Sequence, residues 1–297
     1  MLKSLDEIIE RAKNEASKQI AVAAAADDEV LEVVEEATRL GLAEFILIGN
    51  AAKIKEIAEA NGRVIDAKII DEPDDKKAAE KAVSLVREGE AQAVMKGLLH
   101  TATFMKAVLN KEKGLHAGRL ISQVSIIDNI EGTGLQMITD GVISIKPDLE
   151  TKKTIIENAV DLAHRLGNEC PKVALLSAVE VVNPAMEDTM DAAVLCKMND
   201  RKQIKGCKID GPLALDNALS VEAAKHKGIE SEVAGRADII LVPNIQVGNS
   251  LIKSITYYAG KDMASAIMGA AAPVIMTSRT DSVRNKILSL ALAAVIA

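Results

Sequence analysis

The sequence predicts an α/β protein built on parallel sheets flanked by helices, and three observations indicate this class. Short apolar runs alternate along the chain with longer amphipathic stretches. The apolar runs are continuous rather than interleaved with polar residues, which is typical of strands buried on both faces of a parallel sheet. Asp27 stands between the first such run and the next stretch, where a helix N-cap is expected.

The first part of the chain repeats a strand–helix unit. An amphipathic helix is expected at 4–17, because Leu5, Ile8 and Ile9 recur at helical spacing. The remaining predicted elements are strand 19–26, helix 29–40, strand 44–48, helix 51–60, strand 63–70, helix 76–88 and strand 91–95. Strands and helices that alternate at this interval predict a parallel, doubly wound sheet.

Residues 121–145 depart from this pattern. Their short β-branched runs are separated by Gly132, Gly134 and Gly141, which predicts antiparallel hairpin strands. A second α/β series is then expected, with helix 149–166, strand 172–177, a helix near 184–199, strand 238–243, a helix from Asn249, strand 274–277 and helix 282–296.

The composition excludes several function classes. The 297 residues suffice for two moderate domains. With 2 Phe, 2 Tyr and no Trp, the chain offers few aromatic side chains on which nucleic-acid bases could stack. A net charge of -7 argues against a surface that binds polyanions, although a small anion needs only a few local Arg or Lys side chains. Nucleic acid is therefore not an expected partner.

The cysteines and the N-terminal segment favour a cytoplasmic protein. Cys170, Cys196 and Cys207 form no C-x-x-C motif and no Cys/His cluster, so a reducing compartment and no metal site are expected. The first residues are charged throughout, and no apolar run has the length of a membrane span. We therefore expect no signal peptide and no membrane association.

The best local signal for chemistry is VIMTSRTDSVRNKI at 274–287. An apolar strand delivers Ser278 and Arg279 to the start of a helix that Ser282 could cap. Backbone N–H groups, a hydroxyl and a guanidinium would then converge on one anion. The alternative is that Ser278 and Arg279 are ordinary turn residues.

Two further segments place polar residues after predicted strands. In MKGLLHTATF, Lys96, His100, Thr101 and Thr103 supply cationic and hydroxyl donors, and His100 is a candidate general base or a bystander. The segment ADIILVPNIQVGNSLIK supplies Asn244, Gly248 and Asn249, with Gly248 permitting close backbone approach to a ligand. An ordinary loop before a helix is the alternative for the second segment.

Nucleotide-binding motifs are missing, and the acidic pair is ambiguous. The sequence has no P-loop, and EGTGLQ at 131–136 lacks the third glycine of a dinucleotide fingerprint. Asp210 and Asp216 flank a Gly-Pro turn and could bind a metal or a hydroxyl, but helix capping by Asp216 explains that residue as simply.

Four segments in this order are more specific than any one alone. They are KGLLHTATFMKAVLNKEKGL at 96–115, DGPLALDNALS at 210–220, DIILVPNIQVGNSLIK at 238–253 and TSRTDSVRNKI at 277–287. Together they resemble the phosphate acetyl/butyryltransferase family, most of all its butyryltransferase branch, over nearly the whole chain. The resemblance implies a fold similar to the isocitrate and isopropylmalate dehydrogenases, with a cleft between two α/β domains. The first would hold 1–145 and 266–297, and the second 146–265.

The resemblance also implies an activity. The chain would move a short acyl group, butyryl first, between coenzyme A and inorganic phosphate, by direct thiolate attack on an acyl phosphate in a ternary complex. Ser278 and Arg279 carry over as catalytic residues. The candidate substrate-binding residues are Lys96, Thr101, Gly248 and Asn249. Coenzyme A is a substrate, no tightly bound cofactor is expected, and a homo-oligomer is the usual state of the family.

The general base departs from the family pattern. The acetyltransferase branch has an aspartate where alignment on Ser278 and Arg279 places Asn285, and an amide is no useful base. Asp281 or His100 could substitute, or nearby cations could ionise enough of a thiol whose pKa is about 8.5. The alternatives are a phosphate acetyltransferase, a catalytically silent ligand-binding homologue, and a metal-dependent dehydrogenase on the same fold.

Overall fold

The computed structural model describes residues 1–130 and 134–297. Its contacts divide the chain into two compact units: a terminal unit of Asp6–Arg119 with Ala264–Ala297, and a middle unit of Met1–Leu5 with Leu120–Met263. Both are α/β, as the sequence predicts. The division at residues 145 and 266 stays a prediction of domain boundaries.

The terminal unit is a mostly parallel sheet with helices on both faces. Its elements are α1 (Leu5–Asn14), β1 (Gln19–Ala23), α2 (Asp28–Arg39), β2 (Glu44–Gly49), α3 (Ala51–Ala60), β3 (Lys68–Asp71), α4 (Asp75–Arg87), β4 (Ala93–Lys96), α5 (Thr101–Val108), β10 (Ala264–Met268), β11 (Val274–Ile275) and α11 (Val283–Ile296). The strand order is β3-β2-β1-β4-β11-β10, and β10 is antiparallel to β11.

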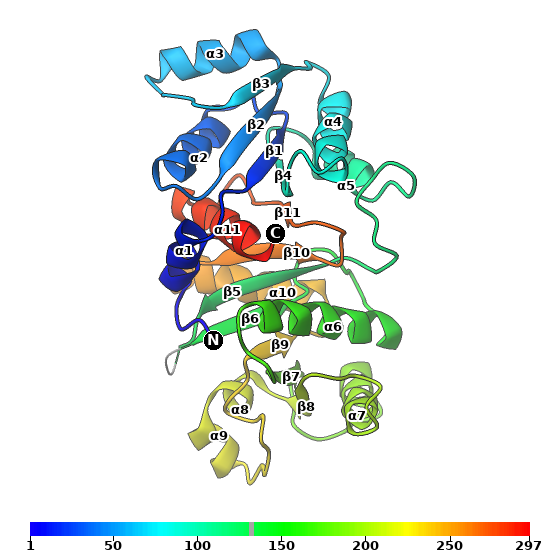
Figure 1. Cartoon of the computed structure of the whole chain (residues 1–297). Coiled ribbons are helices and arrows are strands. Elements are labelled where there is room, and N and C mark those ends of the chain that lie inside the picture. The colour runs from blue at the N-terminus through cyan, green and yellow to red at the C-terminus, as the bar shows by residue number, and fades with distance from the viewer. Residues whose placement is uncertain (131–133) are drawn as a thin grey trace. The chain divides into compact units, whose positions relative to one another are not determined.

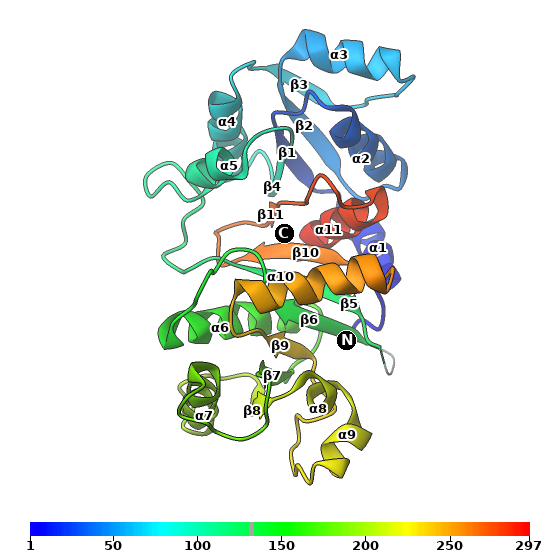
Figure 2. The same ribbon diagram turned by 180° about the vertical axis from the view of Figure 1, so that it is seen from behind.

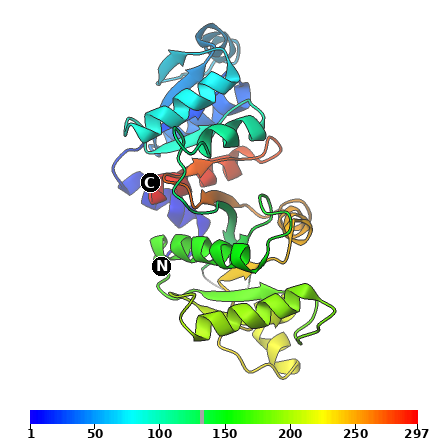
Figure 3. The same ribbon diagram turned by 90° about the vertical axis from the view of Figure 1, so that its right-hand side faces the viewer.

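Burial on both faces explains the continuous apolar runs of this unit. Ile20, Val22 and the alanines of β1 are fully buried. The helices α4 and α5 lie together on one face of the sheet, and α2 and α11 lie on the other (Figures 1 and 3). Because both faces are covered, the inner strands β1, β2 and β4 carry polar residues only at one end of each strand.

The middle unit is a mixed sheet between helices. Its elements are β5 (Ser122–Asp128), β6 (Leu135–Thr139), α6 (Leu149–Arg165), β7 (Lys172–Leu176), α7 (Glu187–Asp200), β8 (Lys208–Leu213), α8 (Leu215–Leu219), α9 (Val221–His226), β9 (Ile239–Leu241), α10 (Ile245–Lys253) and a π-helical turn, η1 (Ser254–Tyr258). The strand order is β5-β6-β9-β7-β8. Figures 1 and 2 show α6 on one face of this sheet and α10 on the opposite face.

The predicted hairpin is confirmed, because β5 and β6 pair in antiparallel fashion and the other strands of the middle unit are parallel. Gly132, and with it most of the glycine-rich piece EGTG, lies outside the described residues. Strand β8 was not predicted. It carries Gly211 and Pro212, which weaken a strand pattern, and its place at the edge of the sheet order is where proline is tolerated.

One helix start was predicted wrongly. The helix expected from Asn249 begins at Ile245, because the Asn244 side chain accepts the Val247 N–H at 3.0 Å and so forms the N-cap. Gly248 and Asn249 therefore lie within α10 rather than in a loop. In contrast, the predicted cap at Ser282 is confirmed, since its hydroxyl accepts the Asn285 N–H at 3.1 Å.

Candidate functional site

The terminal unit has one point at which the direction of its sheet reverses. From β1 the chain adds β2 and β3 on one side, and then places β4 on the other side of β1. In open α/β sheets, ligands bind outside the carboxyl ends of the strands at such a switch point. The segments that leave β1 and β4 there are Ala24–Asp27 and Gly97–His100, and β11 ends beside β4.

Gly97 brings these two segments together. Its N–H donates to Ala23 O at 2.8 Å, and the Leu98 N–H donates to Ala24 O at 2.8 Å. A Cβ atom on residue 97 would lie 2.4 Å from Ala24 O and 2.5 Å from Ala23 O. Only glycine fits where these two backbones cross, so Gly97 allows the segments that follow β1 and β4 to lie against each other at the switch point.

Lys96 and Arg279 form a cationic pair at this edge. The half-buried Lys96 ammonium donates to Gly97 O at 3.1 Å and Leu99 O at 3.4 Å. The pKa of Lys96 is lowered, first by burial and then by the charge of Arg279, with Asp27 acting in the opposite direction. Among the described residues the exposed Arg279 guanidinium has no ion-pair or hydrogen-bond partner, so it is available to an anion.

The turn that carries Arg279 is held by its own polar groups. The Ser278 N–H donates to Asp281 Oδ2 at 2.7 Å, and the Asp281 N–H donates to Ser278 O at 3.2 Å. The Ser278 hydroxyl lies 3.0 Å from Thr280 Oγ1 and accepts the Thr280 N–H at 3.3 Å. The Ser278 side chain is exposed, and Asp281 orients the turn rather than standing free as a base.

Thr101 and His100 begin helix α5 directly after the Lys96-Gly97 segment. His100 occupies the N-cap position, and within the described part of the chain its side chain makes no capping hydrogen bond. Both residues are exposed. The first N–H groups of a helix carry a partial positive charge, which adds to the cationic character of this edge.

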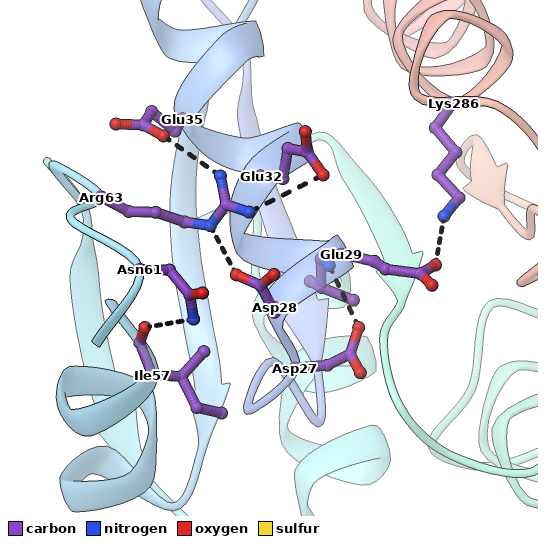
Figure 4. A network of polar contacts seen from close by, with 10 residues as sticks. Asp27, Asp28, Glu29, Glu32, Glu35, Ile57, Asn61, Arg63 and Lys286 are labelled. Atoms are coloured by element: carbon purple, nitrogen blue, oxygen red, sulfur yellow. Dashed lines mark hydrogen bonds and ion pairs between the residues drawn. The ribbon is translucent and has the colours of Figure 1, made fainter. Parts of the chain in front are cut away.

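A charged network borders the same edge (Figure 4). Asp27 caps α2 through the Val30 N–H at 3.2 Å, and buried Lys286 on α11 bonds Glu29 at 2.7 Å. The charge of Lys286 also lowers the pKa of Lys96. The sequence reading missed Lys286, although a lysine followed at once by a long apolar run on α11 was a visible signal.

On the far side of α2, Arg63 binds three carboxylates of that helix, as Figure 4 shows. Its guanidinium lies 2.6 Å from Asp28, 3.7 Å from Glu32 and 3.5 Å from Glu35. Its side chain is 15% exposed, and it holds the pKa of Asp28 below the usual value. This cluster fixes α2 and the segment before β3, and it leaves no cation for a ligand.

Gly248 and Asn249 belong to the middle unit, whereas the residues described above belong to the terminal unit. Gly248 is buried, and a Cβ atom there would lie 2.6 Å from the Cα of Gly141. Its N–H donates to Asn244 O within α10, and the Asn249 side-chain amide donates to Gly141 O at 3.4 Å. The close approach that Gly248 permits is thus to another backbone.

The acidic candidates are occupied by local contacts. Asp210 accepts the Gly211 N–H at 2.8 Å, and Asp216 lies 3.3 Å from Lys227. Asp216 does not cap α8, whose N-cap position is Ala214. In the described residues, His, Cys, Asp and Glu side chains form no group of three or more that could hold a metal ion. None of the described helices is long and apolar enough to cross a membrane.

Comparison with known proteins shows to which family the chain belongs. The family model described as phosphate acetyl/butaryl transferase matches residues 4–81 and 74–294. The chain belongs to this family. A phosphate butyryltransferase of Clostridium acetobutylicum is 50% identical over 100% of this chain and 99% of the relative. A phosphate acetyltransferase of Thermotoga maritima is 44% identical over 99% of both chains.

Solved structures agree with this assignment to the phosphate acetyl/butyryltransferase family. A branched-chain phosphotransacylase from Enterococcus faecalis aligns with a TM-score of 0.83 at 33% identity, covering 93% of this chain and 97% of the other. A putative 4-hydroxythreonine-4-phosphate dehydrogenase from Salmonella typhimurium aligns with a TM-score of 0.62 at 14% identity, covering 95% and 100%. The second likeness concerns the fold alone, and it confirms the predicted dehydrogenase-like fold.

Proposed function

We propose that the chain transfers a short acyl group between coenzyme A and inorganic phosphate, and that butyryl is the preferred group. The observation that carries this proposal is the cationic pair of Lys96 and Arg279 at the switch point, in a family member that matches phosphate acyltransferases over its whole length. The thiolate of coenzyme A attacks the carbonyl carbon of the acyl phosphate. The C–S bond forms, the C–O bond to phosphate breaks, and phosphate leaves with the electron pair.

Arg279 and Ser278 act where charge develops. The exposed guanidinium binds the phosphate oxygens and offsets the charge that grows as the C–O bond breaks. The Ser278 hydroxyl hydrogen-bonds the carbonyl or bridging oxygen, exchanging its contact with Thr280 for that bond. Lys96 and the N-terminal N–H groups of α5, beside Thr101, add positive charge for the phosphate.

The thiol proton needs no strong base on the enzyme in this scheme. Asn285 stands where the resemblance to the acetyltransferase branch implies an aspartate, and Asp281 is bound to the Ser278 N–H. A coenzyme A thiol with a pKa near that of cysteine is a few per cent ionised at neutral pH, and the local cations increase that fraction. Departing phosphate can take up the released proton.

Acetyl is the second candidate for the acyl group, because relatives named phosphate acetyltransferase match at 43% and 44% identity. One methylene in an apolar pocket is worth only about 10- to 200-fold in discrimination, and acetyl and butyryl differ by two, so a pocket fitted to butyryl should favour it over acetyl by more than that factor. Gly248 and Asn249 remain proposed substrate-binding residues of the middle unit. A homo-oligomer, a cytoplasmic location and the absence of a tightly bound cofactor are further proposals.

The test is release of free coenzyme A from acetyl-, propionyl-, butyryl- and isobutyryl-CoA, with and without phosphate. We expect release that depends on phosphate and is fastest with butyryl-CoA. Arg279→Ala should lower turnover about 100- to 1000-fold, the usual effect of removing a preorganised donor. Wild-type turnover by Arg279→Ala would remove the residue from the mechanism.

Arg284→Ala is the matched control. Arg284 lies five residues further along the same segment, and its side chain pairs with Asp6 rather than facing a proposed ligand. We expect it to leave turnover within about twofold of the wild type, since an exposed ion pair contributes little. Folded protein that binds phosphate but releases no coenzyme A would favour the catalytically silent homologue.

A further inference from the structure

The amine of Lys96 is held in place where strand β4 ends. Lys96 directly follows Met95, which pairs with Ile275 of β11, and its side chain contacts the segment that leaves the strand. There the nitrogen donates to Gly97 O at 3.1 Å and to Leu99 O at 3.4 Å. Among the described residues no carboxylate forms an ion pair with it. The amine is therefore positioned by backbone carbonyls rather than by a counter-ion.

The two carbonyl contacts are compatible with an uncharged amine. An ammonium group has three N–H donors, of which Gly97 O and Leu99 O take two. When the third proton is lost, both contacts remain and a lone pair takes the place of the third N–H. That lone pair points away from both carbonyl oxygens. A neutral Lys96 is thus oriented as a nucleophile without any rearrangement of its side chain.

The surroundings of Lys96 favour this neutral form. Burial is the largest cause that lowers its pKa, followed by the positive charge of Arg279. The charge of Asp27 acts in the opposite direction, and that of Lys286 lowers the pKa further. At a given pH, more of this amine is therefore uncharged than of an exposed lysine, and only the uncharged form attacks a carbonyl carbon.

We propose that Lys96 is acylated by an acyl phosphate bound at this edge of the terminal unit, and that the modification weakens phosphate binding there. The inference rests on the proposed function, because that activity supplies the acyl phosphate. The lone pair of the amine attacks the carbonyl carbon, the C–N bond forms, and the C–O bond to phosphate breaks. Phosphate leaves with the electron pair and takes up the proton that the nitrogen loses, so the products are an amide and inorganic phosphate.

Arg279 brings the acyl donor to the amine. Its guanidinium is exposed and binds the phosphoryl group of an acyl phosphate, as it binds inorganic phosphate. The carbonyl carbon is joined to that phosphorus through a single oxygen atom, so the reactive carbon lies at the same edge as Lys96. Both residues belong to the terminal unit. Acylation removes the charge of Lys96, and it becomes significant when coenzyme A is scarce and the acyl phosphate persists.

The test measures where butyryl phosphate acylates the folded chain in the absence of coenzyme A. Peptide mass spectrometry gives the rate at each lysine, and Lys106, an exposed lysine on α5 of the same unit, is the internal reference. We expect Lys96 to react at least about tenfold faster than Lys106, because the donor is held beside it. Added inorganic phosphate should slow the reaction of Lys96 alone.

Butyric anhydride separates anchoring from reactivity, because it carries the same acyl group without a phosphate. With this reagent the rate of Lys96 relative to Lys106 should fall at least about tenfold. Arg279→Ala should slow acylation of Lys96 by butyryl phosphate at least about fivefold, since it removes both the anchor and a charge that lowers the pKa of Lys96. Arg284→Ala, which removes a cation paired with Asp6, is the matched control and should leave both rates unchanged.

The consequence for phosphate is measured by equilibrium dialysis. Preincubation with butyryl phosphate should weaken phosphate binding by the wild type at least about tenfold, the usual effect of losing one hydrogen bond to a charged group. Lys96→Arg keeps a positive charge but has no nucleophilic amine, so preincubation should leave its own phosphate affinity unchanged. Lys106→Arg should respond as the wild type does. Thermal unfolding checks that each variant folds.

The outcomes separate this proposal from the proposed function, because butyryl phosphate is added rather than made by the chain. Acylation of Lys96 no faster than that of Lys106, or acylation that neither phosphate nor Arg279→Ala slows, overturns the proposal even when the chain turns over butyryl-CoA. Acylated protein that binds phosphate as well as before overturns it too. Preferential acylation of Lys96 with loss of phosphate binding supports it, even when the chain releases no coenzyme A.

Discussion

Replacing Gly97 with alanine tests whether the crossing of β1 and β4 holds the candidate site together. The new Cβ atom would lie 2.4 and 2.5 Å from two carbonyl oxygens of β1 and its extension, whereas real Cβ atoms essentially never come within 3.0 Å of such atoms. The obstacle is backbone rather than a mobile side chain. The two segments must therefore move apart by roughly half an ångström or more.

The expected loss of stability follows from what that movement disturbs. Two backbone hydrogen bonds of 2.8 Å join the segments, each contributing about 1 kcal/mol. Overpacking adds about 1–3 kcal/mol to the loss of stability. Alanine also restricts the unfolded chain more than glycine does, which restores about 0.4–1 kcal/mol of stability. We expect Gly97→Ala to lower the free energy of unfolding by about 2–4 kcal/mol and to raise the KM for phosphate, because Lys96 precedes the displaced residue.

Gly49→Ala provides the comparison. Gly49 ends β2, the other neighbour of β1, but a Cβ atom there would lie 3.1 Å from the Ala25 N, so a small adjustment suffices. Urea unfolding followed by circular dichroism is the assay, since the chain has no Trp. Equal midpoints for the two variants would refute the argument from close backbone approach.

Three other predictions concern single side chains. Because the pKa of Lys96 is lowered, acylation of its amine should reach half its maximal rate at a lower pH than for an exposed lysine, and bound phosphate should move that midpoint upward. Burial raises the pKa of the Cys196 and Cys207 thiols to about 12, so a thiol reagent at pH 8 should modify only Cys170 in the folded chain and all three cysteines in urea. Arg63→Ala should lower the free energy of unfolding by about 1–2 kcal/mol, a value reduced because its carboxylate partners are 32–46% exposed; urea unfolding measures it.

Each of these predictions would be contradicted by a specific result. A Lys96 midpoint equal to that of an exposed lysine, or one that phosphate lowers, would contradict the electrostatic account of the site. Rapid modification of a second thiol in the folded chain would show that a buried cysteine is accessible. An Arg63→Ala variant as stable as the wild type would mean that the three carboxylates repel one another less than the geometry suggests.

The sequence predicted the elements whose signals are local. The buried strands β1, β2 and β4 follow from continuous apolar runs, and the cap at Ser282 follows from its place before an apolar helix. The pairing of β5 with β6 was likewise visible in short runs separated by glycine.

Contacts between distant residues could not be predicted in this way. The partner of Gly248 is Gly141, 107 residues earlier, and nothing near Gly248 indicates it. The lowered pKa of Lys96 depends on burial and on Arg279, which only the sheet order brings near.

The order in which the terminal unit is assembled has a consequence for its synthesis. Strand β11 lies between β4 and β10, yet the ribosome makes it long after β4. At about 5–20 residues per second, roughly ten to thirty-five seconds separate the two strands. During that time the β4 edge lacks its neighbour and can pair with another nascent chain. In the middle unit the β6 edge also waits for β9, but over about 100 residues instead of about 178. A chaperone that shields the emerging β4 edge should therefore raise the yield of folded protein more than one that acts after release.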